Sequence, residues 1–417
     1  MKKILFALTA AFAITACCNN KTATVTVAND TALDRAGQIV EIPMSEVAAL
    51  LQLSNDEQIV ISDAEGKEIP YQITFDEKLI FPADVPAGTT VTYTVKTGTP
   101  ADVPVIACGK HYPERVDDIA WENDRVAFRT YGPALQATGE RAFGYDVWTK
   151  YNTAEPVVEA RYDMELNPET LAGIDSLKST DPQAARELRA ATSYHVDHGN
   201  GLDCYKVGPT LGGGTAALIA GDQIIYPYCY KTYEILDNGP LRFTLQLQYN
   251  PLTVTDNPNV VETRTISLDA GSYMNKAVIS YSGLNESVKI AAGLVLHEPE
   301  GTAVVAADAA NGYMTYVDPT DNVNADNGKI FLGVVVPAGI AKEIKIVYFS
   351  EEERKKERGG ADGHLLAISD YEPGTDYIYY FGSAWSKAAV KDAASWNKYV
   401  SEYAQKVRNP VTVTLSK

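Results

Sequence analysis

With 417 residues and 45% hydrophobic side chains, the chain can form two or three domains, or one large β domain with a small companion. The formal net charge of -18 excludes a general nucleic-acid-binding role, because binding phosphate needs a basic surface. Acidic polymers remain compatible with this charge only if a local pocket of Arg, Lys and His receives them.

The first residues resemble a bacterial lipoprotein signal. Two lysines precede "ILFALTAAFAITA", an apolar run too short to span a bilayer stably. The sequence "ITAC" at 14–17 resembles a lipobox, which implies cleavage before Cys17 and acyl chains on its sulfur and new amino group. Such chains anchor a protein without a transmembrane helix. We therefore predict a signal peptide over 1–16 and a lipidated tether over 17–22.

This signal predicts attachment to the bacterial cell envelope, at the periplasmic face or the outer membrane. The alternative is a soluble secreted protein whose cysteine merely lies near the cleavage site. Beyond the signal, Cys108, Cys204 and Cys229 form an odd set, which argues against a disulfide framework. One disulfide remains possible in an oxidising periplasm, but the sequence does not choose the pair.

Residues 23–104 read as a small β-sandwich. Segments such as "ATVTVAND", "QIVISD" and "TVTYTVKTG" alternate in polarity or are rich in β-branched residues, and turns separate them about every ten residues. Proline and glycine in "PADVPAG" and "TGTPADVP" mark the end of this region.

Residues 105–417 read as a larger antiparallel β domain. Long strand-like segments, including "LRFTLQLQY" and "GKIFLGVVVP", continue to about residue 350. A helical insertion is predicted over 166–192, with "TDP" as a break, and an amphipathic helix over 384–407. "NPVTVTL" then predicts a closing strand. The predicted fold is therefore mainly β: a large antiparallel β-supersandwich, a small N-terminal β-sandwich and one or two helices.

Four separate blocks resemble one known family. They are "HYPERVDDIAWENDRVAFRTYGPAL", "GYDVWTKY", "YHVDHGNGLDCYKVGPTLGGG" and "YYFGSAWSKA". Together they resemble the domain-of-unknown-function family 4861, from bacterial clusters that degrade complex polysaccharides. The resemblance covers nearly the whole mature chain and implies a galactose-mutarotase-like supersandwich. It also implies an oligosaccharide dehydratase as the reaction class, without assigning that reaction to residues.

The first block offers groups suited to elimination from a uronate sugar. That reaction must neutralise a carboxylate, remove the adjacent proton and protonate the leaving oxygen. Alternation along the strand places Arg125 and Arg129 on one face, where they line an anionic site or form surface ion pairs with Glu122 and Asp124. His111 and Arg115 lie just before this strand.

The second block contains His195 and His198, whose spacing would put both rings on one side of a helix ending near Gly199. Three interpretations stay open: a divalent-metal site with Asp197 or Asp203, a pair of catalytic or substrate-binding histidines, and a structural turn. HxxH alone is weak evidence for a metal. We therefore predict histidines that transfer protons or bind substrate, and no obligatory metal or cofactor.

The glycines that follow this block do not match a strand-to-helix nucleotide-binding pattern, so we expect Gly212–Gly214 to let a loop pass close to another backbone. The predicted partner is an oligosaccharide, and the predicted function is β-elimination on uronate-containing oligosaccharides by a lyase or dehydratase. The candidate catalytic residues, expected to converge in one pocket, are His111, Arg129, Tyr194, His195 and His198. The candidate substrate-binding residues are Arg115, Trp121, Glu122, Trp148 and His297.

Two other functions remain open. A non-catalytic glycan-binding lipoprotein would present an exposed aromatic platform around Trp121, Trp148 or Trp385. A glycoside hydrolase would need two suitably separated carboxylates, and Glu122 and Asp124 are too close in sequence to supply them convincingly.

Overall fold

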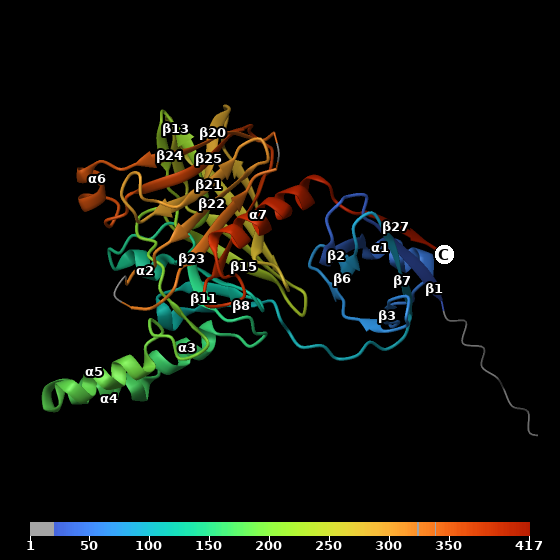
Figure 1. Cartoon of the computed structure of the whole chain (residues 1–417), viewed down its shortest axis with the longest axis horizontal. Coiled ribbons are helices and arrows are strands. Elements are labelled where there is room, and N and C mark those ends of the chain that lie inside the picture. The colour runs from blue at the N-terminus through green and yellow to red at the C-terminus, as the bar shows by residue number, and fades with distance from the viewer. Residues whose placement is uncertain (1–20, 323–324, 338) are drawn as a thin grey trace, which may run out of the picture.

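The computed structural model describes residues 21–322, 325–337 and 339–417. The predicted signal peptide, tether and lipidated Cys17 lie outside these residues. The fold is mainly β and antiparallel, as the sequence predicts. Figure 1 shows the N-terminal strands gathered at one end of the molecule together with the last strand of the chain, beside the larger body formed by the residues between them. Within the described ranges, no helix is long and apolar enough to cross a membrane.

The N-terminal part consists of two small sheets around their own hydrophobic core. Its elements are β1 (Thr22–Ala28), β2 (Arg35–Pro43), α1 (Met44–Leu51), β3 (Ile59–Ser62), β4 (Glu68–Ile69), β5 (Gln72–Ile73), β6 (Lys78–Val85) and β7 (Thr90–Thr97). The last strand of the chain, β27 (Thr412–Ser416), pairs with β1. The predicted second domain, residues 105–417, therefore does not include its closing strand, which belongs to the N-terminal sheet.

The larger body contains three further sheets. The sheet that carries the candidate site has the order β12-β11-β10-β9-β8. Its strands are β8 (Cys108–Tyr112), β9 (Asp118–Glu122), β10 (Ala127–Thr130), β11 (Asp146–Lys150) and β12 (Gly201–Asp203). A short 3₁₀ turn, η1 (Pro113–Arg115), joins the first two strands, and α2 (Pro133–Ala137) follows the third.

The other two sheets pack face to face, as a sandwich does. Strands β13 and β20 of a five-stranded sheet contact β23 and β26 of a nine-stranded sheet. The first contains β13 (Gly213–Ala220), β14 (Gln223–Ile225), β20 (Val288–Leu296), β24 (Ala341–Tyr348) and β25 (Gly363–Tyr371). The second contains β15 (Tyr230–Asn238), β16 (Arg242–Tyr249), β17 (Leu252–Val254), β18 (Asn257–Asp269), β19 (Met274–Ser282), β21 (Val305–Asp308), β22 (Tyr313–Asp318), β23 (Ile330–Val335) and β26 (Tyr377–Trp385).

Residues 166–192 form the helices that the sequence predicts. After α3 (Val158–Glu165), the helices α4 (Pro168–Thr180) and α5 (Pro182–Thr192) are separated at Asp181, whose side chain accepts a hydrogen bond from the Ala184 N–H. Proline at the first position of α5 and the aspartate cap explain why the break falls at "TDP". Figure 1 shows α4 and α5 projecting from the body as a helical arm.

The C-terminal helix starts later than the sequence predicts. The segment "YYFGSAW" is the buried end of β26, and α7 (Ala393–Arg408) begins only after Asp392, which caps it by accepting a hydrogen bond from the Ser395 N–H. The helix packs on β22 and β23 through its buried face. The short helix α6 (Glu351–Lys356) corresponds to the charged run "EEERKKERGG".

The glycines after the second motif block allow the close backbone approach that the sequence predicts. Gly212 has a φ of +55°, and a Cβ there would lie 2.4 Å from the Tyr145 carbonyl oxygen. The Gly213 N–H donates to that same carbonyl at 2.8 Å. This contact holds the start of β13 against the residue that precedes Asp146, and so helps to position the site.

Candidate functional site

One face of the β8–β12 sheet carries the buried charges of the candidate site. In the strand register, Arg129 lies opposite both Ala120 and Asp146, and Trp148 lies opposite Asp203. Side chains two residues apart on a strand share a face. The side chains of Asp118, Arg129, Asp146 and Asp203 therefore project from the same side of the sheet.

Arg129 is the centre of this cluster and is only 3% exposed. Its Nη2 lies 2.5 Å from Asp146 Oδ2 and 2.7 Å from Asp203 Oδ2, and its Nη1 lies 3.5 Å from Asp118 Oδ2. Nη1 also donates to the Tyr162 hydroxyl at 2.7 Å. One guanidinium thus faces three buried carboxyl groups. Since burying unbalanced negative charge is costly, the cluster favours keeping a proton on at least one of them.

The pKa values of two carboxyl groups follow this imbalance. Burial raises the pKa of Asp146 to about 7, against the attraction of Arg129 and with the added repulsion of Asp203. Burial likewise raises the pKa of Asp118 to about 6, although Arg129 and Arg115 oppose the rise. Carboxyl groups that titrate near neutral pH can donate or accept a proton during a reaction.

Aromatic side chains line the charged cluster. The Arg129 guanidinium lies 5.5 Å from the ring centre of Trp148, and Tyr194 stacks on that indole at 5.3 Å. Arg115 donates from Nε to the Tyr194 hydroxyl at 3.0 Å. His195 packs against Tyr194, with 4.4 Å between ring centres, and its side chain is 52% exposed. The cluster therefore reaches solvent at His195.

A histidine–aspartate pair lies beside this cluster. His297 follows β20, and its Nδ1 lies 2.7 Å from Oδ2 of the buried Asp318 at the end of β22. A carboxylate at this distance favours the proton on Nδ1 and leaves Nε2 with a free lone pair. Within the described part of the chain, this buried Nε2 has no hydrogen-bond partner, and neither does the buried hydroxyl of Tyr205. The Tyr205 and His297 rings meet edge to face at 5.8 Å.

The charges of the Arg129 cluster and of the His297–Asp318 pair act on the same neighbouring side chains. Burial raises the pKa of Tyr205 well above its ordinary value, and the charges of Asp318 and Asp146 add to the rise. Partial burial, followed by the charge of Asp203, raises the pKa of Asp321, while His195 opposes it. The Asp321 N–H donates to the Cys204 carbonyl. The site therefore extends from His195 at the surface to Tyr205 and the His297 pair inside.

The structure brings together part of the predicted site. Arg129 is the centre of the buried cluster, and His297 lies beside it. Four other predicted residues line the cluster: Arg115, Trp148, Tyr194 and His195.

His111 does not join them. It lies opposite Ile119, whereas Arg129 lies opposite Ala120, so the two side chains point to opposite faces of the sheet. His111 Nε2 instead lies 3.3 Å from Asp117 Oδ1, and its ring packs on Tyr233.

The expected helix around His195 and His198 is not present, because α5 ends at Thr192. The Asp197 carboxylate accepts hydrogen bonds from the N–H groups of Gly199 and Gly201 and so stabilises a turn. His198 Nε2 lies 3.2 Å from the Ser193 carbonyl in this turn. The two histidine rings are therefore not aligned on one side of a helix, and the His198 ring contacts the turn.

The exposed aromatic platform that the alternative glycan-binding function would need is not formed by the tryptophans. Trp121 is completely buried and donates to Asn275 Oδ1, and Trp148 and Trp385 are buried as well. Glu122, expected to bind substrate, is buried and lies 2.7 Å from Lys150 Nζ. Glu122 also accepts hydrogen bonds from the N–H groups that precede and begin α3. These contacts make it an anchor for that helix.

The sequence-based reasoning missed most of the aspartates. Asp118 and Asp146 lie inside apolar strands, "DIAWE" and "DVWTK", where aspartate is disfavoured unless something holds it. That unusual placement was the available signal. Tyr205 lies in the second motif block, next to the histidines, and the sequence already marks it as a proton carrier. Asp318 had no such signal, because only the packing of distant strands brings it to His297.

Neither a metal cluster nor a disulfide is formed by the described residues. Across the described ranges, no group of three or more His, Cys, Asp or Glu side chains is arranged to hold a metal ion. Cys108, Cys204 and Cys229 are all unpaired thiols.

Comparison with known proteins identifies the family. An uncharacterized protein P7 of Formosa agariphila is 27% identical over 409 residues, covering 94% of this chain and 93% of that protein. Two solved structures from Enterococcus faecalis, a glycosyl hydrolase family 38 protein and an alpha-mannosidase, match with TM-scores of 0.47 and 0.45, each at 8% identity. Each match covers 95% of this chain, which spans only 48% and 46% of those two chains. The model of the family described as "Domain of unknown function (DUF4861)" matches residues 27–413, and the chain therefore belongs to this family.

Proposed function

We propose that the protein is a carbohydrate-active enzyme that acts on uronate-containing oligosaccharides by β-elimination, as a lyase or dehydratase. The observation that carries this proposal is the pair of buried, unpartnered polar atoms, His297 Nε2 and the Tyr205 hydroxyl, with Asp318 behind the imidazole. Buried polar atoms are normally hydrogen-bonded, so an unpartnered pair beside a cluster of buried charges fits a site that a substrate completes.

In this proposal His297 is the general base. Its Nε2 takes the proton on the carbon next to the substrate carboxylate, and Asp318 stabilises the imidazolium that forms. The electron pair of the broken C–H bond forms the C=C bond, and the C–O bond to the leaving group breaks. Tyr205 donates its proton to the leaving oxygen, and the proton on His297 restores it. The raised pKa of Tyr205 keeps this hydroxyl protonated before the reaction.

The substrate carboxylate needs positive charge close by. Arg129 is buried and faces three carboxyl groups already, so we do not assign it to the substrate carboxylate. Arg115 and His195 both contact Tyr194 nearer the surface, and we assign them to the carboxylate or to the neighbouring hydroxyl groups. The proton held near neutral pH on Asp146 limits the negative charge that faces an anionic substrate.

Elimination fits the described residues better than the two alternatives do. A glycan-binding platform has no support in the tryptophans, because Trp121, Trp148 and Trp385 are buried. Asp146 and Asp203 contact the same nitrogen of Arg129, so their contacting oxygens are closer than the roughly 6.5–9.5 Å that inverting glycosidases use. A retaining glycosidase needs one carboxylate free as a nucleophile, whereas both of these are buried against Arg129.

The test is turnover of purified protein on uronate-containing oligosaccharides, read as absorbance of the new C=C bond. His297→Gln and Tyr205→Phe should each lower kcat/KM by about 10²–10⁴-fold, the usual contribution of a positioned acid or base. His111→Gln, a histidine on the opposite face, is the matched control and should keep normal activity. Full activity in both site variants would overturn the assignment.

A further inference from the structure

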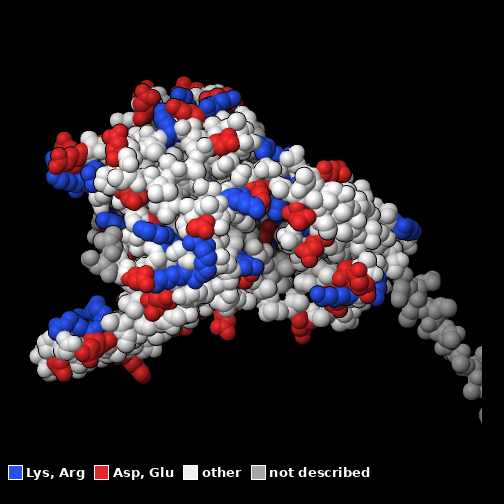
Figure 2. All heavy atoms as spheres, viewed as in Figure 1, with Lys and Arg blue, Asp and Glu red and all other residues white. Residues whose placement is uncertain are grey.

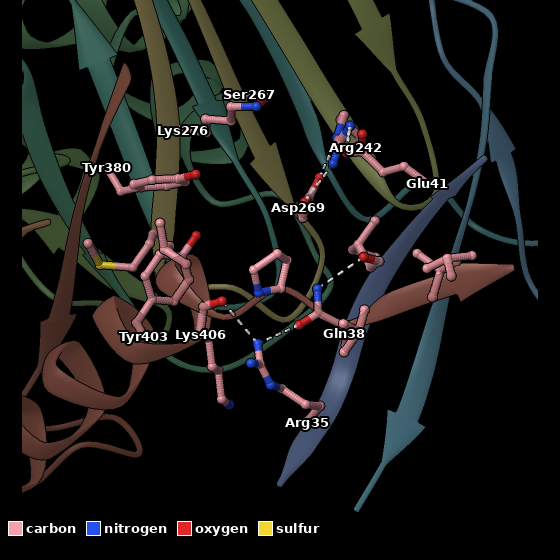
Figure 3. Close-up of a pocket in the computed structure, with 17 residues that line it drawn as sticks. Arg35, Gln38, Glu41, Arg242, Ser267, Asp269, Lys276, Tyr380, Tyr403 and Lys406 are labelled. Carbon is pink, nitrogen blue, oxygen red and sulfur yellow. Dashed lines mark hydrogen bonds and ion pairs between the residues drawn. The ribbon is translucent and has the colours of Figure 1, made fainter. Parts of the chain in front are cut away.

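A second cavity lies between the N-terminal sheets and the larger body. Its volume is about 420 Å³, which is within the range of small-ligand pockets. It is enclosed by β2, by β18, β19 and β26 of the nine-stranded sheet, and by the end of α7 (Figure 3). Its lining shares no residue with the cluster around Arg129 or with the His297 pair.

The charges that line this cavity do not cancel. Arg242 is neutralised, because it lies 2.7 Å from Glu41 and 2.6 Å from Asp269. The buried Arg35 instead donates to the Lys406 and Asn409 carbonyls and to Gln38, none of which carries a negative charge. Figure 3 shows Arg35 reaching toward Lys406 and Gln38 on this side of the cavity.

Two lysines add to this positive charge. Among the described residues, neither Lys276 nor Lys406 forms an ion pair. Burial lowers the pKa of Lys406, and the nearby charge of Arg35 lowers it further. The cavity therefore has Lys276 on one side and Arg35 with Lys406 on the other, in a chain whose net charge is -18 (Figure 3). Figure 2 shows acidic and basic groups interspersed over one face of the molecule. In the cavity lining, by contrast, the four cations Arg35, Arg242, Lys276 and Lys406 outnumber the two carboxylates, Glu41 and Asp269.

The remaining lining suits a sugar ring. Ser267, Lys276 and Tyr380 are register partners on three adjacent strands, so their side chains form a row on one face of the sheet. Tyr380 meets Tyr403 of α7 edge to face at 5.5 Å. Hydroxyl groups, tyrosine rings and cations in one cleft match the apolar faces, hydroxyls and negative groups of an acidic saccharide.

We propose that this cavity is a second saccharide-binding site, which holds a sugar unit that carries a sulfate or carboxylate. Lys276 on one side of the cavity, or Arg35 with Lys406 on the other, binds the anionic group, and the two tyrosines pack against the ring. The site is separate from the proposed reaction, and its ligand does not have to be turned over.

The test is calorimetric titration of the full chain with a glucuronate disaccharide, a sulfated disaccharide and a neutral disaccharide of the same size. The protein carries His297→Gln, so that turnover does not interfere and the result does not depend on the proposed chemistry. At least one of the anionic sugars should bind, with the better one identifying the anionic group, and added salt should weaken that binding.

The decisive comparison adds Lys276→Ala and Lys406→Ala together. This pair should weaken binding of the anionic sugar by about tenfold or more, as expected for the loss of charge-assisted hydrogen bonds. The control pair, Lys289→Ala and Lys398→Ala, removes the same charge from β20 and α7 outside the cavity and should leave binding unchanged. Equal affinity in both pairs would overturn the proposal, and so would equally tight binding of inorganic sulfate alone or of the neutral sugar.

Discussion

Asp146 and Asp118 show how burial sets the chemistry of single residues. The pKa of each aspartate is raised because its strand is buried on both sides. On an exposed surface, neither pKa would be raised. Arg129 compensates only part of their charge. The proton that the cluster retains near neutral pH is therefore a property of the folded arrangement, and it should appear in the stability of the protein.

The stability of the protein should fall as the pH rises through the pKa of Asp146. The folded pKa of about 7 lies above the ordinary value of about 4, so the contribution is complete below about pH 4 and is lost by about pH 7. Asp146→Asn should remove part of this slope. Denaturant unfolding at about pH 5 and about pH 8 measures it. Parallel slopes for the two proteins would contradict the assigned pKa.

Glu122 and Lys150 should matter for stability and not for substrate binding. Glu122→Ala leaves the buried Lys150 ammonium without its carboxylate and frees the first N–H groups of α3. Removing one partner of a buried pair costs about 3–5 kcal/mol, so the free energy of unfolding should drop by that amount. The KM of the folded fraction should stay normal. A raised KM with unchanged stability would restore Glu122 to the substrate-binding residues.

For the helices and strands, the sequence predicts those boundaries that nearby residues determine, such as a cap or a proline. The break between α4 and α5 was predictable, because proline and a capping aspartate coincide at 181–182. The start of α7 was not, since "YYFGSAW" has the composition of either a buried strand or an amphipathic helix. The pairing of β27 with β1 and the opposite faces of His111 and Arg129 depend on strand register, which one sequence does not reveal.

The packing of β13 against β26 supplies a test at this scale. Gly214 has a φ of +123°, and a Cβ there would lie 2.5 Å from the Phe381 Cβ. Gly214→Ala should therefore lower the free energy of unfolding by more than about 1 kcal/mol. Gly221→Ala is the control, because Gly221 also has a positive φ but has no atom within 4 Å of the added Cβ. Equal losses in thermal unfolding would show that crowding by Phe381 is unimportant.

For the whole molecule, we propose attachment to the bacterial cell envelope through Cys17, which lies outside the described residues. The lipobox-like "ITAC" motivates this proposal. Cys17→Ser should release a soluble or unprocessed form, because the thioether-linked lipid cannot then be added. Cell fractionation with immunoblotting measures the change. A mutant that matures and fractionates with membranes as before would contradict the lipobox interpretation.

The most direct test of the proposed function is the mass of the products formed from a uronate oligosaccharide in ¹⁸O-labelled water. A lyase divides the chain without adding water, so the product masses sum to that of the substrate, and a dehydratase gives one product lighter by one water. Either result, with no ¹⁸O incorporated and with loss of the signal in His297→Gln, is what β-elimination at this site predicts. Products that carry ¹⁸O at the cleaved bond would show hydrolysis and contradict it.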